Sequence, residues 1–166
     1  GVGTMAIQIA KAKGCNVIAT GGSEQKRDHA KNIGADFVLD HYNENIVNQV
    51  NEYTDGFGVD VIIEHVGEST WKKSMKILGK GGRLVTCGAT TGPKVNIDLR
   101  HLFSKQQNIM GSTMGDSAAF SECLSLILDR KIKPVIDRSF SFGEIREAHD
   151  YLENSSQIGK VILLPE

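Results

Sequence analysis

The first six residues of the chain have the composition and spacing needed to hold the phosphates of a nucleotide. Gly1–Ala6 reads G-V-G-T-M-A, which fits the dinucleotide-binding pattern G-x-G-x-x-A and runs directly into a helical pattern. The N–H groups and positive dipole end of a helix attract a pyrophosphate. The pattern also requires a preceding strand. Because the sequence opens at Gly1, two alternatives remain, a fortuitous match at a helix start or a chain cut inside a longer fingerprint.

A second group of residues, about 20 positions later, bears on the choice of cofactor. The apolar run 17–20 predicts a strand, and Gly21 stands where an Asp or Glu would accept the ribose hydroxyls of NAD. The residues that follow are small, hydroxylated or basic: Gly22, Ser23, Lys26 and Arg27. Such groups suit the dianionic 2′-phosphate of NADP, so the sequence predicts NADP rather than NAD. The alternative is a capped, solvated helix start, which Ser23 and Lys26 would also satisfy.

Both groups need a framework of strands and helices, and the hydrophobic periodicity predicts one. Runs rich in Val and Ile predict buried parallel strands at 16–20, 37–39, 59–64, 83–87 and 108–112. Helical patterns lie between them at 4–13, 24–32, 45–53 and 71–78. Alternation of this kind, with right-handed crossovers, predicts an α/β fold with a doubly wound parallel sheet.

The pattern changes after about residue 115. A longer amphipathic helix is predicted at 119–128, with Phe120, Cys123, Leu124 and Ile127 on its apolar side. A half-buried strand at 135–142, a helix at 143–152 with Ile145, Ala148 and Leu152 inward, and a strand at 160–164 then follow. These last elements do not continue the α/β repeat. We therefore predict a nucleotide-binding domain at 1–115 and a separate portion at 116–166.

Composition excludes several classes of partner and site. The chain has 19 Lys and Arg against 20 Asp and Glu, a net charge of −1, which argues against nucleic acid. Three widely spaced cysteines predict reduced thiols and a cytoplasmic protein rather than a disulfide framework. No apolar run reaches the roughly 18 residues of a membrane span. The five histidines show no metal-ligand spacing, so neither a metal ligand nor a catalytic residue is identified in this chain.

Motifs spread over the whole chain resemble one protein family. They are the opening GVGTMAIQIAK, VIAT with the turn from Ser23 to Lys26, AK with GAD at 30–36, GGRLV with GATTG at 81–92, GSTM at 111–114, and GKVIL at 159–163. In this order they resemble the medium-chain dehydrogenase/reductase superfamily, in particular its zinc-type alcohol dehydrogenase and quinone oxidoreductase branch. The resemblance runs from Gly1 to Leu164.

The resemblance implies that the first strand and the start of the phosphate loop lie before residue 1. Gly3 then aligns with the third glycine of the fingerprint, which lets the helix pack closely on that strand. The expected fold is a Rossmann-like sheet lacking its first strand, with 116–166 as the returning C-terminal segment of a GroES-like catalytic domain. In zinc-dependent members the metal ligands lie in the N-terminal part, so zinc ligands are expected outside this chain. The chain alone is expected to show no turnover.

The resemblance also implies a set of residues that contact NADP. They are Val2, Gly3 and Thr4 at the pyrophosphate, Gly22, Ser23 and Lys26 at the 2′-phosphate or adenosine ribose, Val66 near the adenine ribose, Gly88, Ala89 and Thr90 after the fifth strand, and Gly111, Ser112 and Thr113, expected as the sixth strand, at the nicotinamide carboxamide. The alternative is that these are only buried sheet ends. Gly159 and Lys160 fall where relatives approach the cofactor again, or form a plain terminal strand.

Three functions remain open on this basis. The first is hydride transfer between NADP(H) and a small alcohol, aldehyde or ketone, with this chain supplying the cofactor-binding half. The second is a zinc-free quinone or enoyl reductase of the same superfamily. The third is a non-catalytic nucleotide-binding module. The resemblance further implies a homodimer through the sixth strand, around 108–112.

Overall fold

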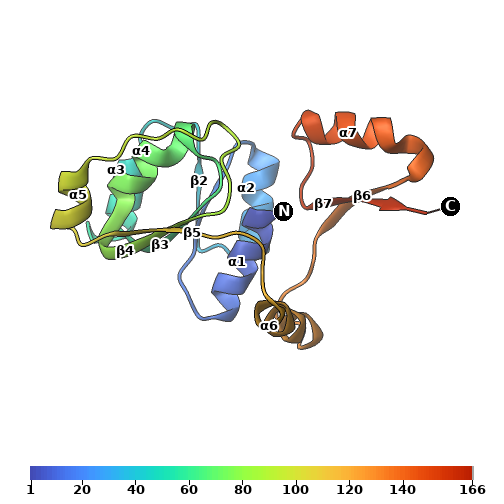
Figure 1. The fold of residues 1–166 in the computed structure, drawn as a ribbon, viewed down its shortest axis with the longest axis horizontal. Helices are drawn as coiled ribbons and strands as arrows, with labels where there is room; N and C mark the ends of the chain where they lie inside the picture. The colour runs from blue at the N-terminus through green and yellow to red at the C-terminus, as the bar shows by residue number, and fades with distance from the viewer. Residues whose placement is uncertain (166) are drawn as a thin grey trace. The chain divides into compact units, whose positions relative to one another are not determined.

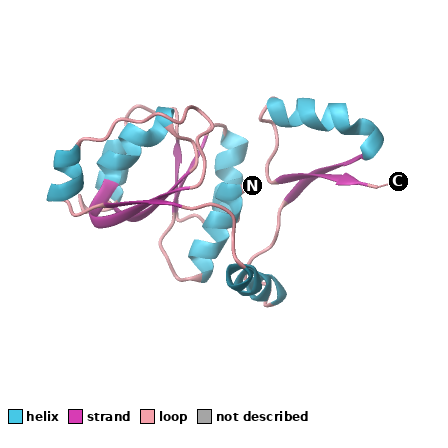
Figure 2. Ribbon diagram, viewed as in Figure 1, coloured by secondary structure: helices cyan, strands magenta, loops and turns pink. Residues whose placement is uncertain are grey.

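A computed structural model describes residues 1–165 as an alternation of helices and parallel strands (Figures 1 and 2). The elements are α1 (Val2–Ala12), β1 (Ile18–Gly21), α2 (Glu24–Asn32), β2 (Phe37–Asp40), α3 (Ile46–Tyr53), β3 (Val59–Glu64), α4 (Glu68–Ile77), β4 (Leu78–Thr86), α5 (Leu99–Ser104), β5 (Asn108–Gly111), α6 (Ser117–Leu128), β6 (Ile136–Ser141), the 3₁₀ turn η1 (Phe142–Glu144), α7 (Ile145–Glu153) and β7 (Lys160–Leu164). The predicted α/β class with parallel sheets is confirmed. Internal contacts define two compact units, the first comprising Gly1–His41 with the chain from Asp116 onward, the second Tyr42–Gly115.

The first unit contains two pairs of parallel strands. β1 pairs with β2, and α2 packs against both strands. Buried Ile7, Val17, Ala30 and Ala35 form the core beside them, so that α1 and α2 share one apolar cluster. β6 pairs with β7, and α7 contacts both.

The second unit is built on three parallel strands in the order β3-β4-β5. Glu64, Thr86 and Gly111 end the three strands side by side, so the carboxyl ends meet at one edge. α4 packs on β3 and β4 and also contacts α3 (Figure 1). Trp71 lies in the core with Leu78 and Leu84, as its helical spacing predicts.

The start of β4 differs from the prediction. The strand begins at Leu78, whereas the apolar run predicted a start at residue 83. Glycines at 79, 81 and 82 carry no hydrophobic signal, yet the backbone there approaches its neighbour closely. A Cβ on Gly79 would lie 2.7 Å from the carbonyl oxygen of Phe57. The register shift between Val59 and Val61 accommodates this stretch.

The predicted burial of the C-terminal elements is partly wrong. α6 has no buried residue, and Phe120 on its predicted apolar side is 69% exposed. In α7 only Ala148 is buried, whereas Ile145 and Leu152 are exposed. Cys123 and Ile127, on the same side of α6 as Phe120, are half-buried. β6 is exposed along most of its length. The division at residue 115 stays a prediction, and Glu166 lies outside the described residues.

Replacing Val50 with alanine is expected to destabilise the second unit. Val50 lies on α3 and is 1% exposed, so the change removes two buried methyl groups and leaves a cavity. We expect the free energy of unfolding to fall by about 2 kcal/mol. Urea titration followed by circular dichroism measures this fall, and an unchanged midpoint would contradict the packing of α3.

Candidate functional site

The first turn of α1 has no side-chain cap. Val2, Gly3 and Thr4 lie in this turn after Gly1 at the N-cap, and the turn carries no acidic residue. Its N–H groups and the positive end of the helix dipole are therefore available to an anion. A Cβ on Gly3 would meet nothing within 4 Å among the described residues, so the role of Gly3 in close packing stays a prediction.

One lysine lies beside this helix start. The Lys160 Nζ lies 3.3 Å from the position that a Cβ on Gly1 would take. A positive group at a helix N-terminus favours an anion. Lys160, which the sequence left open as a plain strand residue, thus lies beside the predicted phosphate-binding turn.

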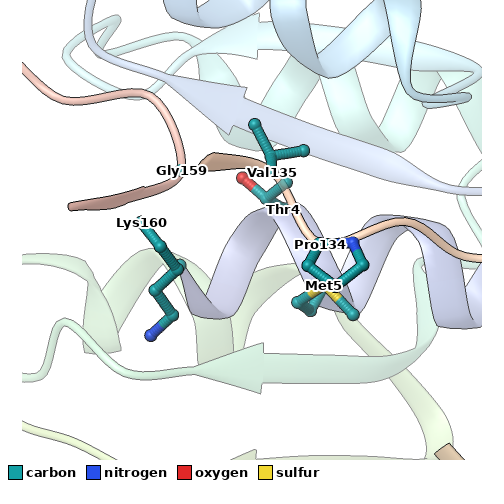
Figure 3. A pocket seen from close by; sticks show the side chains of 7 residues that line it. Thr4, Met5, Pro134, Val135, Gly159 and Lys160 are labelled. Carbon is teal, nitrogen blue, oxygen red and sulfur yellow. The ribbon is translucent and has the colours of Figure 1, made fainter. Parts of the chain in front are cut away.

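A small pocket adjoins this helix start. It has a volume of about 190 Å³, and Thr4, Met5, Val135 and Lys160 are among its lining residues (Figure 3). Gly159 allows the close approach of two segments here, because its φ is +113° and a Cβ would lie 2.5 Å from the Val135 carbonyl oxygen. The pocket therefore offers an apolar wall next to a cationic rim, a combination suited to an organic phosphate.

A side chain at Gly21, in the turn after β1, would pack tightly against α2. A Cβ on Gly21 would lie 3.1 Å from the backbone nitrogen of Arg27, in the first turn of α2. Gly22 follows in the turn, and Ser23 caps α2 by accepting a hydrogen bond of 3.3 Å from the Lys26 backbone N–H. The cap that the sequence offered as an alternative is thus present. It does not exclude a phosphate, because the N–H groups of Glu24 and Gln25 take no part in it.

The two cations of this turn differ in their surroundings. Arg27 is paired with Asp40, with 3.1 Å between Nη1 and Oδ2, and also donates to the Gly21 carbonyl. Lys26 Nζ donates to the Ser155 carbonyl at 2.5 Å. A carbonyl contact leaves the ammonium charge of Lys26 uncompensated, whereas the carboxylate of Asp40 offsets the charge of Arg27. Lys26 is therefore the better partner for an added phosphate.

The remaining predicted residues lie at the carboxyl ends of the strands of the second unit. Val66 follows β3, Gly88, Ala89 and Thr90 follow β4, and Gly111 ends β5, with Ser112 and Thr113 after it. Backbone hydrogen bonds continue the sheet here, from Cys87 N–H to the Glu64 carbonyl at 3.1 Å and from Ser112 N–H to the Thr86 carbonyl at 2.9 Å. The structure thus brings these segments together. The expected strand over 111–113 is wrong in extent, because β5 ends at Gly111.

A buried carboxylate, which the sequence did not single out, ends β3. Glu64 is 4% exposed and accepts hydrogen bonds from the N–H groups of Val66 at 2.8 Å and Gly67 at 3.2 Å. β3 ends at Glu64, as the apolar run 59–64 predicted, and the carboxylate takes the donors of the turn that follows. Burial alone raises the pKa of the Glu64 carboxyl, but hydrogen bonds from Ser74, the two amides and Thr70 outweigh it and lower the pKa. The sequence signal that could have identified Glu64 is an acidic residue at the end of an apolar strand.

The N-terminus of α4, unlike that of α1, is already occupied. Its N-cap Gly67 has a φ of +93°, and the Glu68 N–H donates to the Gly92 carbonyl at 3.2 Å. The Ser69 N–H donates to Thr91 Oγ1 at 3.1 Å. The loop after β4 therefore occupies the donors of this helix start, in contrast to the starts of α1 and α2.

The described residues do not fit a metal ion. Within residues 1–165, no three His, Cys, Asp or Glu side chains gather in a way that could hold one. His65, which directly follows β3, therefore belongs to no metal-ligand group among these residues. In the same part of the chain, no helix has the length and apolar character needed to cross a bilayer.

Comparisons with known proteins agree with this geometry. A family profile described as zinc-binding dehydrogenase matches residues 1–129. A zinc-type alcohol dehydrogenase-like protein from Schizosaccharomyces pombe is 31% identical, over 98% of this chain and 49% of its own length. A quinone oxidoreductase from Salmonella typhimurium is 33% identical, over 99% of this chain and 54% of its own. The chain thus spans about half the length of these relatives.

Solved structures give the same picture. A crystal structure of an NAD-dependent alcohol dehydrogenase superimposes with a TM-score of 0.92 at 35% identity, over 98% of this chain and 48% of the other. A crotonyl-CoA carboxylase/reductase in complex with NADP superimposes with a TM-score of 0.86 at 25% identity, over 99% of this chain and 47% of the other.

Proposed function

Because this chain belongs to the zinc-binding dehydrogenase family of the medium-chain dehydrogenases/reductases, we propose that it binds NADP(H) for an oxidoreductase acting on a small alcohol, aldehyde or ketone. The observation that carries the proposal is the uncapped start of α1 with Lys160 beside it. The bound nicotinamide supplies the hydride chemistry, and the protein binds and orients it.

Each group of residues has a role in this proposal. The N–H groups of the first turn of α1, formed by Val2, Gly3 and Thr4, hold the pyrophosphate. Gly22, Ser23 and Lys26 take the 2′-phosphate. In the second unit, the strand-end residues Val66, Gly88, Ala89, Thr90, Gly111, Ser112 and Thr113 take the ribose and the nicotinamide.

The preference for NADP over NAD rests on the chain's own residues, since the similar structures include both an NAD-dependent enzyme and an NADP complex. Gly21 supplies no acidic side chain to bind the ribose hydroxyls of NAD, and any side chain there would pack tightly against Arg27. Among residues 1–165, no carboxylate forms an ion pair with Lys26, whose ammonium donates to the Ser155 carbonyl. Binding of NADPH and NADH, followed by fluorescence, tests this preference directly. Equal affinity for the two would contradict it.

A zinc-free quinone or enoyl reductase is the second candidate, favoured by the similarity to a quinone oxidoreductase. Within residues 1–165 no group of side chains could hold zinc, and zinc ligands are expected outside this chain. Activity measured with and without a chelator, on alcohols and on quinones, distinguishes the two enzymes. Binding of NADPH without turnover on either substrate class, in the protein as naturally produced, would instead support a nucleotide-binding module.

We also propose a cytoplasmic homodimer joined through β5. Cys15, Cys87 and Cys123 are free thiols, two of them exposed, which suits a reducing compartment. Among the described strands, β5 pairs only with β4, which leaves its other edge open for a second copy of the chain. Sedimentation of the protein as a monomer at all concentrations would exclude this assembly.

Replacing Lys160 with glutamine is expected to weaken NADPH and NADH alike, because the pyrophosphate is common to both. Removing one charge beside the phosphates should raise each Kd about fivefold. Lys31→Gln is the matched control, since Lys31 lies in the last turn of α2, at the end opposite Ser23. Isothermal titration measures both variants. Unchanged affinity for both nucleotides in Lys160→Gln would remove Lys160 from the phosphate site.

A further inference from the structure

We propose that Glu64 is a positioning residue, which holds the turn after β3 and, through it, the loop after β4 in the arrangement that receives the cofactor. The inference rests on the proposed nucleotide binding. Glu64 itself ends β3 and is buried, so it acts on a ligand only through its neighbours.

The first step runs from the carboxylate to the turn. Glu64 Oε1 accepts from the N–H groups of Val66 and Gly67, at 2.8 and 3.2 Å, and fixes two consecutive backbone positions. The hydroxyl of Thr70 lies 3.0 Å from Oε1 and 2.9 Å from Oε2, and the hydroxyl of Ser74 donates to Oε2 at 2.8 Å. Both hydroxyls belong to α4, so one carboxylate ties the turn to the helix that follows it.

The second step runs from the turn to the loop after β4. The Val66 carbonyl accepts hydrogen bonds of 2.8 Å from both the N–H and the hydroxyl of Thr91. Gly67 packs so closely on this loop that a Cβ there would lie 3.1 Å from Cα of Ala89. Displacing the turn therefore displaces the segment that contains Gly88, Ala89 and Thr90, because no gap separates the two.

The physical reason for a charged residue here is the number of donors. Four groups donate to Glu64, and hydrogen bonds to an ionised acceptor are about twice as strong as neutral ones. A carboxamide of the same shape has one acceptor oxygen and a donor NH₂, so it cannot accept from all four with charge assistance. Ligands in open α/β sheets bind at the carboxyl ends of the strands, where this turn lies.

The test compares Glu64→Gln with Val50→Ala in the protein as naturally produced. Val50 is buried in the same unit, on α3, where its carbonyl accepts hydrogen bonds from Thr54 and not from the turn after β3. Both variants should remain folded well below their melting temperatures. There, Glu64→Gln should raise the Kd for NADPH about five- to tenfold and speed amide exchange at Val66 and Gly67, whereas Val50→Ala should change neither.

The outcomes separate this inference from the proposed function. Wild-type protein that binds no NADPH overturns both. Wild-type binding with an unchanged Kd in Glu64→Gln overturns only the positioning role, as does an equal loss in Val50→Ala. Glu64→Gln keeps the shape of the side chain. Ser74→Ala is a milder second variant, because it removes one donor to the carboxylate and leaves the two turn amides bound. It should raise the Kd by less than Glu64→Gln, and a larger effect than that would also overturn the inference.

Discussion

Replacing Ser23 with aspartate is expected to weaken NADPH binding about 10- to 100-fold while changing NADH binding little. Aspartate is as good an N-cap as serine, so the start of α2 should survive the change. The new carboxylate would repel the dianionic 2′-phosphate by about 1.5–3 kcal/mol at distances of roughly 5 Å and effective dielectric constants between those of water and a protein surface. NADH lacks that phosphate and should be spared.

The matched control for this change is Ser23→Asn. Asparagine also caps helices well and carries no charge, so it isolates repulsion from loss of the cap. Fluorescence titration with both nucleotides gives the four Kd values needed. A similar loss in Ser23→Asn, or equal losses for NADPH and NADH in Ser23→Asp, would show that this turn does not receive the 2′-phosphate.

Replacing Gly67 with alanine should cost both stability and cofactor affinity. Gly67 has a φ of +93° and a ψ of −128°, a conformation outside the left-handed helical region that costs an L-residue about 1–3 kcal/mol. Its Cβ would also lie 2.5 Å from the Gly92 carbonyl oxygen, so the loop after β4 would have to move. Together we expect a loss of about 3–4 kcal/mol in the free energy of unfolding and at least about tenfold weaker NADPH binding.

Gly56→Ala separates the two contributions to this loss. Gly56 has a φ of +80° in the same unit, but a Cβ there would meet nothing within 4 Å. Alanine at Gly56 should therefore cost only the conformational part, about 1 kcal/mol, and leave NADPH binding unchanged. Urea unfolding and nucleotide titration of both variants measure the difference. Equal costs at the two positions would mean that the loop after β4 does not rest on the turn.

The framework was predictable because its signals are local. β3, α2 and β7 lie at 59–64, 24–32 and 160–164, as the apolar runs and the capping residue Ser23 predicted. In each case the neighbouring residues alone determine the structure.

The parts that could not be predicted depend on residues distant in sequence. Glu64 gains its role only when α4 brings Thr70 and Ser74 to the end of β3. Lys160 lies beside the start of α1, although the two are at opposite ends of the sequence. The periodicity of α6 predicts an apolar side, but it does not specify which element covers that side, and Phe120 is exposed.

The burial of Trp71 has a spectroscopic consequence. It is the only tryptophan in the 166 residues, it is 6% exposed, and it packs with Leu78 and Leu84 in the second unit. An indole in such apolar surroundings emits at shorter wavelength than one in water, so its emission should shift to the red when this unit opens. Because Trp71 sits on α4 next to Thr70, one intrinsic chromophore reports on the helix that Glu64 anchors, without any label.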